Sequence, residues 1–418
     1  MKRMIRLPRT AMLLLAWLYF SSPAHAQNAT WIGTTSDWNT GTNWTPIPPG
    51  TLTPPTGTAE FGTPGVKTLT LSSTSTVENL VFNVPGYSFN FIQSLTITGT
   101  GITGNAPSFE LPGGNLQFTN SSTAGPAIIH VFGLGPLNFF DMSNAGHATI
   151  NAGIAGSTNG DTGGFVHFLG NSSAANAAIT SFFGSNIEFH DTSKAGNATL
   201  TADIGGSIFF ENASSADHAT IRMLPGSAEL SFSPAFFGGG TATAGNATII
   251  NNGTTNFYQG SSGGNATITT NEMGVTRFFG ESTGGNAAFI TNAGGIVDIS
   301  GLGTFPDGGS GPNVPGMTAG SIEGAGTYNL GSKELTVGSN NLSTTVSGLI
   351  EGNGGSLVKV GTGTLTLTDN NTYSGGTTIQ DGTLVVGTPS AAQEISFALG
   401  TGDVFCREEP CGRRAWIR

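Results

Sequence analysis

Charged residues are scarce in this chain of 418 residues, and basic residues are the scarcest of them. Lysine, arginine, aspartate and glutamate together make up 9% of the sequence. Between Gln27 and Phe405 there are 23 carboxylates and only six basic residues, a net charge of −17. A region without a basic patch is not expected to bind nucleic acid or an anionic membrane.

Cysteine is almost missing as well. Cys406 and Cys411 both lie within the last 13 residues, so the body of the chain has neither a disulfide scaffold nor a cysteine nucleophile. The motifs H-E-x-x-H, C-x-x-C, G-x-S-x-G and the phosphate-binding loop are also missing. We therefore expect no catalytic residues, no cofactor and no bound metal.

Long apolar runs are confined to the N-terminus, and no later segment is long enough for a membrane helix. Basic residues from Lys2 to Arg9 precede the apolar run Ala11–Phe20, and Ala24-His25-Ala26 resembles a cleavage site. This order is typical of a secretory signal peptide. We predict that residues 1–26 are removed during export and that the mature chain begins at Gln27.

The most informative feature that is present is a repeat. The motif A-G-N-A-T-I and its variants occur nine times, and six of the eight spacings are 19 or 21 residues. The other two, 29 and 28 residues, fit a 21-residue unit with an insertion. A fixed period near 20 indicates a solenoid. The third residues of the nine copies are Asn105, Pro126, His147, Asn176, Asn197, His218, Asn246, Asn265 and Asn286.

Each unit contains two alternating segments. In the first, Ala and a large apolar residue stand two positions apart, as in Ala148/Ile150, Ala198/Leu200 and Ala247/Ile249, with Thr or Ala between them. Positions two apart share one face of a strand, so Ala and Ile should point inward and Thr outward. The second segment holds Leu116/Phe118, Leu137/Phe139, Ile187/Phe189, Ile208/Phe210 and Val297/Ile299. Such units bury their apolar side only by stacking, which predicts an all-β, right-handed parallel β-helix with 20–21 residues per coil.

The repeat also divides the chain. Residues 27–100 are predicted to form a Trp-rich cap and the first coils, with Trp31, Trp38 and Trp44 covering the open core. A sugar-binding aromatic platform is the alternative for these three rings. Residues 101–300 are the regular coils, 301–316 a loop or junction, and 317–387 further coils. Residues 388–418 are predicted to be an aberrant or disordered tail outside the fold, which leaves an open edge near Thr383–Val386.

The segment Val358–Gly387 resembles the autotransporter-associated β-strand repeat of type V secretion passengers. The positions that fit are Gly361, Gly363, Leu365, Leu367, Asn371, Tyr373, Gly375, Gly376, Thr378, Ile379, Gly382 and Leu384. The resemblance implies an exported β-helix passenger whose repeat assists export and folding. A translocator barrel needs many more residues than follow this segment, so we expect it to be absent and the chain to remain in the periplasm unless another route leads to the surface.

One acidic cluster bears on the alternative of an enzyme. Glu188 and Asp191 flank His190, and Glu211 and Asp217 lie about one coil later. Stacking could bring Glu188 near Glu211, as a polysaccharide lyase or glycoside hydrolase would require. Solvated turn charges are the simpler interpretation. The sequence favours a non-catalytic passenger that binds host or neighbouring-cell surface molecules or self-associates; the enzyme is the alternative.

Overall fold

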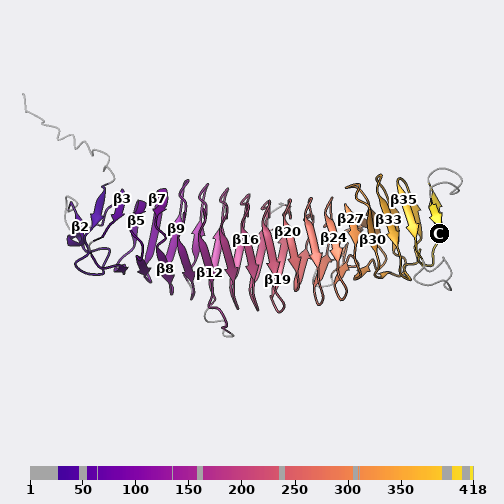
Figure 1. Ribbon diagram of the computed structural model, residues 1–418, viewed down its shortest axis with the longest axis horizontal. Coiled ribbons are helices and arrows are strands. Elements are labelled where there is room, and N and C mark those ends of the chain that lie inside the picture. Colours follow the sequence, from indigo (N-terminus) through magenta and orange to yellow (C-terminus); the bar gives the residue numbers. More distant parts are fainter. Residues whose placement is uncertain are drawn as a thin grey trace, which may run out of the picture.

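The computed structural model describes residues 27–46, 54–63, 65–133, 135–157, 163–234, 241–304, 309, 311–387, 398–406 and 415–417. These residues form a long rod of stacked coils, with the first and last described strands at opposite ends of the rod (Figure 1). The predicted signal peptide, residues 1–26, lies outside the described residues.

A first sheet of 16 strands runs along most of the rod. All its neighbours pair in parallel except β1 and β2, so one wall holds fifteen coils of the solenoid. In spatial order its strands are β2 (Trp44–Thr45), β1 (Ala29–Trp31), β3 (Thr58–Phe61), β5 (Ser75–Phe82), β7 (Ser94–Gly104), β9 (Asn115–Phe118), β11 (Leu137–Phe139), β13 (Phe165–Phe168), β15 (Asn186–Phe189), β17 (Ser207–Glu211), β19 (Glu229–Ser233), β21 (Thr254–Phe257), β23 (Val275–Phe278), β25 (Ile296–Asp298), β28 (Thr327–Asn329) and β31 (Ile350–Glu351).

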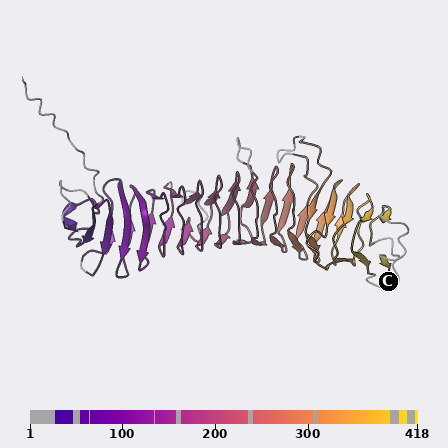
Figure 2. The same cartoon turned by 90° about the horizontal axis from the view of Figure 1, so that it is seen from above.

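A second sheet of 12 parallel strands forms the facing wall. Its strands alternate along the chain with those of the first sheet, as Figure 2 also shows from above. They are β4 (Thr68–Leu69), β6 (Ser88–Asn90), β8 (Ser108–Leu111), β10 (Ile128–Val131), β12 (Thr149–Ala152), β14 (Ala178–Ser181), β16 (Thr199–Ala202), β18 (Thr220–Met223), β20 (Thr248–Asn251), β22 (Thr267–Thr270), β24 (Ala288–Thr291) and β27 (Ser321–Glu323). The predicted all-β parallel β-helix is confirmed.

The register of the second sheet places the repeat as predicted. Ile150 and Leu200 lie in one row with Ile249, and all three side chains are fully buried. The Ala residues two positions earlier are buried as well. The first copy of the motif is the exception, because Ala106 is exposed and the inward row passes through Phe109. That copy has Ser108 where the others have a large apolar residue, so the strand shifts by one position to bury the phenylalanine ring.

The inward face of the first sheet includes a column of stacked phenylalanines. Consecutive rings are 4.6–5.0 Å apart and within 10° of parallel, since each coil places its ring over the previous one. The column contains Phe118, Phe139, Phe168, Phe189, Phe210, Phe232, Phe257 and Phe278. Offset stacking of this kind adds to the burial of apolar area, so the column stabilises both the core and the register.

The repeat's glycine has a conformational role at the corner between the two sheets. Gly146 and Gly196 adopt φ of 61° and 63°, the left-handed region that residues with a Cβ avoid. At the same place in other coils stand Ala175, with φ 53°, and Asp217, with φ 50°. These two coils therefore carry local backbone strain that the glycine coils do not.

The two long spacings are insertions, as predicted. One lies between β12 and β13, and the other between β19 and β20. Strand pairing continues across both: Ile150 pairs with Ile179, and Ile221 with Ile249. Because the additional residues lie between strands, they leave the stacking of the coils unchanged.

The three N-terminal tryptophans are fully buried and pack edge to face. Trp31 donates its indole N–H to the carbonyl of Val66, and Trp44 donates to that of Trp38. They lie beside the short 3₁₀ helix η1 (Gly41–Asn43) and the antiparallel strand β2, where they close the end of the core. Buried rings offer no face to a sugar, so the alternative of an aromatic platform does not hold for them.

Near residues 301–316 the cross-section changes. Up to there, the corner after the first sheet holds one isolated bridge per coil, for example Lys194 with Ser215. Beyond it, this side becomes a third sheet of five strands, β26 (Gly316–Ala319), β29 (Glu334–Val337), β32 (Ser356–Lys359), β34 (Thr377–Ile379) and β36 (Val404–Cys406). A fourth sheet contains β30 (Thr344–Val346), β33 (Thr364–Leu367), β35 (Thr383–Val386) and β37 (Ala415–Ile417).

The expectation of an open edge at Thr383–Val386 is wrong for the described part of the tail. β36 pairs in parallel with β34, and β37 pairs with β35. An unpaired strand edge presents free N–H and C=O groups to any neighbouring segment, and Val404–Cys406 and Ala415–Ile417 are apolar enough to pair there. Cys406 is disulfide-bonded.

Candidate functional site

The outer face of the first sheet gathers histidine and glutamate side chains from three consecutive coils. His167 lies on β13, Glu188 on β15 and Glu211 at the end of β17, while His190 directly follows β15. His167 and Glu188 are register partners. Strand alternation points these side chains outward because Phe168, Phe189 and Phe210 fill the intervening inward positions.

These four side chains form one connected chain of polar contacts. Oε2 of Glu188 lies 3.1 Å from Nε2 of His190 and 3.4 Å from Nε2 of His167. Nδ1 of His190 lies 3.2 Å from Oε2 of Glu211. Asn186 donates its amide N–H to Oε1 of Glu188 at 3.0 Å. With 22–34% of their side-chain surface exposed, the four groups are only partly solvated.

The cluster fixes the charge of its histidines. Hydrogen bonds to Glu188 and Glu211 raise the pKa of His190 to about 9, against the opposing effect of burial. Burial lowers the pKa of His167. Burial acts to raise the pKa of Glu188, but hydrogen bonds from His190 and Asn186 outweigh it and lower that pKa. At neutral pH, His190 is therefore a cation held between two carboxylates, and His167 is neutral.

This arrangement supports the stacking of coils better than it supports hydrolysis. A glycoside hydrolase needs a carboxylic acid with a raised pKa that can donate a proton to the leaving group. Glu188 has the opposite shift, and one of its oxygens already contacts both imidazoles. The cluster instead joins β13, β15 and β17 by contacts between charged groups.

Of the residues singled out in the sequence, the structure brings Glu188, His190 and Glu211 together. Asp191 and Asp217 lie elsewhere, in turns with φ of 55° and 50°. Oδ2 of Asp191 accepts a hydrogen bond from the N–H of Gly170, and Asp217 pairs with His218. For these two acids, the interpretation as turn charges is the right one.

Sequence reasoning missed His167. It stands 21 residues before Glu188, so the coil period alone could have placed the two side by side. His147 and His218 occupy the corner turns of coils three apart, as expected from their places in the repeat.

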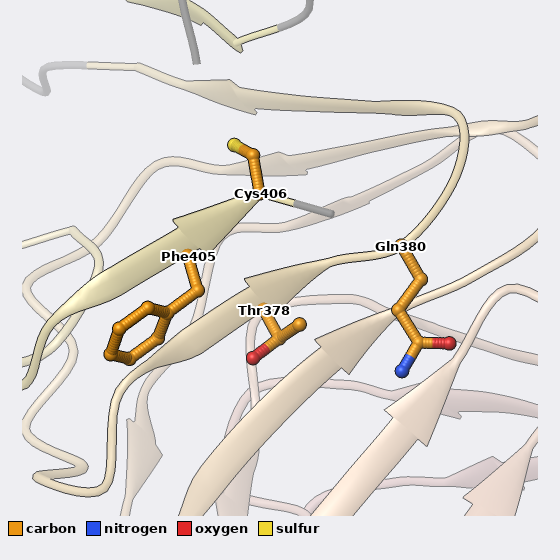
Figure 3. A pocket seen from close by; sticks show the side chains of 4 residues that line it. All are labelled: Thr378, Gln380, Phe405 and Cys406. Atoms are coloured by element: carbon orange, nitrogen blue, oxygen red, sulfur yellow. The ribbon is translucent and has the colours of Figure 1, made fainter. Parts of the chain in front are cut away.

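Two hollows on the described surface contain few groups suited to catalysis. The one near the C-terminus is lined by Thr378, Gln380, Phe405 and Cys406 (Figure 3). A second, between β28, β31 and the following turn, contains Glu351 as its one ionisable side chain. Within the described ranges, no three His, Cys, Asp or Glu side chains are placed to hold a metal ion. The same residues include no helix of the length and apolarity that crossing a bilayer would require.

Near the C-terminal end, buried polar side chains join successive coils. The Lys359 ammonium, 1% exposed as a residue, donates to the carbonyls of Val360, Gly361 and Asp381 at 2.7, 2.9 and 3.3 Å. Asn371 accepts from the N–H of Ile350 and donates to the carbonyl of Ala398. Each of these side chains forms hydrogen bonds with backbone groups of a neighbouring coil, so this segment holds successive coils together.

Comparison with known protein families identifies this same segment. Residues 357–386 match the family model of the passenger-associated-transport-repeat. A comparison with curated proteins finds no match to the chain. The repeat implies export towards the cell surface. A parallel β-solenoid that carries a passenger-associated transport repeat near its C-terminal end fits an autotransporter passenger.

Proposed function

We propose that this chain is a non-catalytic passenger that acts through its surface, in adhesion to host or neighbouring cells or in self-association. The observation that carries this proposal is the outer face of the second sheet. There, threonines stand in register on successive strands, at Thr199, Thr220, Thr248 and Thr267. Such a row is polar and uncharged, and it repeats at the strand spacing of about 4.8 Å.

Repetition supports an interaction role because it allows many weak contacts at once. Four successive coils present a threonine hydroxyl at this position, so a partner with its own repeating surface gains avidity without a strong single contact. A cell-surface glycan and a second copy of this chain both have such a surface. Binding to a glycan on another cell requires the chain to reach the cell surface, whereas self-association is also possible in the periplasm.

We further propose that the passenger-associated transport repeat assists export and folding by forming a stable end of the rod. Its buried Lys359 and Asn371 bond to backbone groups of adjoining coils. Once these bonds form, the segment can serve as the template on which the neighbouring coil stacks.

The second candidate is a polysaccharide-active enzyme, and one observation favours it. Glu188 and Glu211 flank the cationic His190 on the outer face of a β-helix. In that case His190 would be the proton donor, since the carboxylate of Glu188 is held ionised.

One experiment separates the two functions. The chain beginning at Gln27 is coated on beads and tested for attachment to bacterial and epithelial cells, and its sedimentation is followed over a range of concentrations. The same preparation is incubated with neutral and acidic polysaccharides, and new reducing ends and unsaturated products are measured. We expect attachment or self-association without turnover. Turnover that disappears in the variant Glu211→Gln would replace this proposal with the enzyme.

A further inference from the structure

A second polar cluster lies on the outer face of the first sheet, farther along the rod. It contains Glu229 on β19, Asn256 on β21 and Arg277 on β23, together with Tyr258 and Phe279, which directly follow β21 and β23. Asn256 and Arg277 are register partners. The Tyr258 and Phe279 rings stack with centroids 5.3 Å apart and 17° between planes.

Glu229 organises one side of this cluster. Its Oε1 accepts hydrogen bonds from the Asn256 amide at 2.7 Å and from the Tyr258 hydroxyl at 3.0 Å. Burial and the charge of Glu229 raise the pKa of Tyr258, so the phenol stays protonated as a donor. These two bonds leave the second oxygen of Glu229 as an acceptor.

Two groups in the cluster lack partners. The guanidinium of Arg277 makes no hydrogen bond or ion pair with the residues that the structure describes. Asn256 is 7% exposed, and its Oδ1 accepts no hydrogen bond. The amide nitrogen of Asn256 donates to Glu229 on β19, and Arg277 on β23 is the register partner of Asn256.

The unsatisfied oxygen of Asn256 is covered by protein and out of reach of a ligand, whereas Arg277 is partly exposed and can pair with a ligand from solution. Leaving a buried acceptor without a donor costs about 1–3 kcal/mol. Arg277 is one of only six basic residues in a region of net charge −17, and it is the one cationic group of this cluster that can attract an anionic ligand. The combination of one cation, one remaining carboxylate oxygen and a stacked aromatic pair matches a ligand with hydroxyl donors and an acidic group.

We propose that Glu229, Asn256, Tyr258, Arg277 and Phe279 form a binding site for an acidic saccharide of the uronic-acid class. Arg277 pairs with the sugar carboxylate, and the second oxygen of Glu229 accepts a hydrogen bond from one of its hydroxyl groups. The aromatic pair packs against the apolar face of the ring. This inference rests on the proposed surface interaction and names the chemistry of its partner.

The test uses trigalacturonate and the neutral maltotriose as probes in calorimetric titrations of the chain that begins at Gln27. The variants are Arg277→Gln and Tyr258→Ala. The control is Arg222→Gln, which removes the same charge from an exposed position on β18 of the opposite sheet. We expect trigalacturonate to bind in the millimolar range or tighter and maltotriose at least about tenfold more weakly. Either cluster variant should weaken trigalacturonate binding about tenfold or more, and the control should leave it unchanged.

Three results would overturn the site: no binding of trigalacturonate, equal binding of maltotriose, or equal weakening by Arg277→Gln and Arg222→Gln. Circular dichroism of each variant checks that it is folded. If cell attachment persists while trigalacturonate fails to bind, only this site is wrong. If trigalacturonate binds as expected but the chain neither attaches nor self-associates, the proposed function fails and the site stands.

Discussion

Replacing Ile249 or its neighbour Ile250 with aspartate tests which side chains of a coil point into the core and which point outward. Ile249 is fully buried on β20, between Ile221 on one neighbouring strand and Ile268 on the other. Ile250 follows on the same strand, points outward and is partly exposed. The variants Ile249→Asp and Ile250→Asp therefore make the same chemical change on opposite faces of one strand.

The expected cost at Ile249 has two parts. Removing the buried isoleucine side chain loses about 2 kcal/mol of apolar burial. An aspartate with an ordinary pKa near 3.9 must also be protonated to enter the core at pH 7, which costs a further ~4 kcal/mol at 1.36 kcal/mol per pKa unit. The total is about 6 kcal/mol, whereas Ile250→Asp should cost less than about 1 kcal/mol.

The assay is urea unfolding by circular dichroism at pH 7 and pH 4, with limited proteolysis to detect opening of the coils around β20. Ile249→Asp should unfold at a much lower urea concentration and be cut within these coils. Its deficit should shrink at pH 4, because about half of the carboxyl groups are then already protonated in the unfolded chain and most of the protonation cost disappears. Equal midpoints for the two variants would refute the assignment of faces, and an unchanged deficit at pH 4 would refute the burial of a carboxyl group.

Three other predictions follow from single sites. Ala175→Gly, at φ 53°, should stabilise the chain by about 1 kcal/mol, while Ala178→Gly in β14 should destabilise it by about 0.5–1 kcal/mol. If thermal unfolding shows that both variants change stability in the same direction, Ala175 is not strained. The pKa of His190 is raised in the folded chain, so the protonated imidazole should stabilise the fold fully below about pH 6.5 and lose this effect as pH rises through about 9. The urea midpoint of the wild type should therefore fall across this range, and that of His190→Gln should change less. Phe210→Ala should cost about 3–5 kcal/mol and outward-facing Phe209→Ala far less, and similar losses in urea unfolding would refute the core column.

The sequence alone determined the architecture, because the physical cause of a solenoid is periodic. Ala, Ile and Phe recur at the coil period, and only stacking buries them together, so Ile249 and Phe210 could be placed inward without coordinates. The transport repeat could be recognised for the same reason, since its glycines and apolar residues keep fixed spacings. Periodicity also indicated that Glu188 would lie near Glu211.

Tertiary structure decided which outward side chains meet. His167 contacts Glu188 and Arg277 stands unpaired beside Asn256, at outward positions whose residue type the repeat motif does not specify. The outward positions between the inward residues can hold almost any residue type, because their side chains face solvent. The strand register places neighbouring side chains one strand spacing apart, and their rotamers determine which atoms are in contact. Hydrogen bonds and burial then determine the charge of His190. The pairing of the tail also depended on the structure, because an open strand edge accepts a partner segment whether or not that segment follows the repeat.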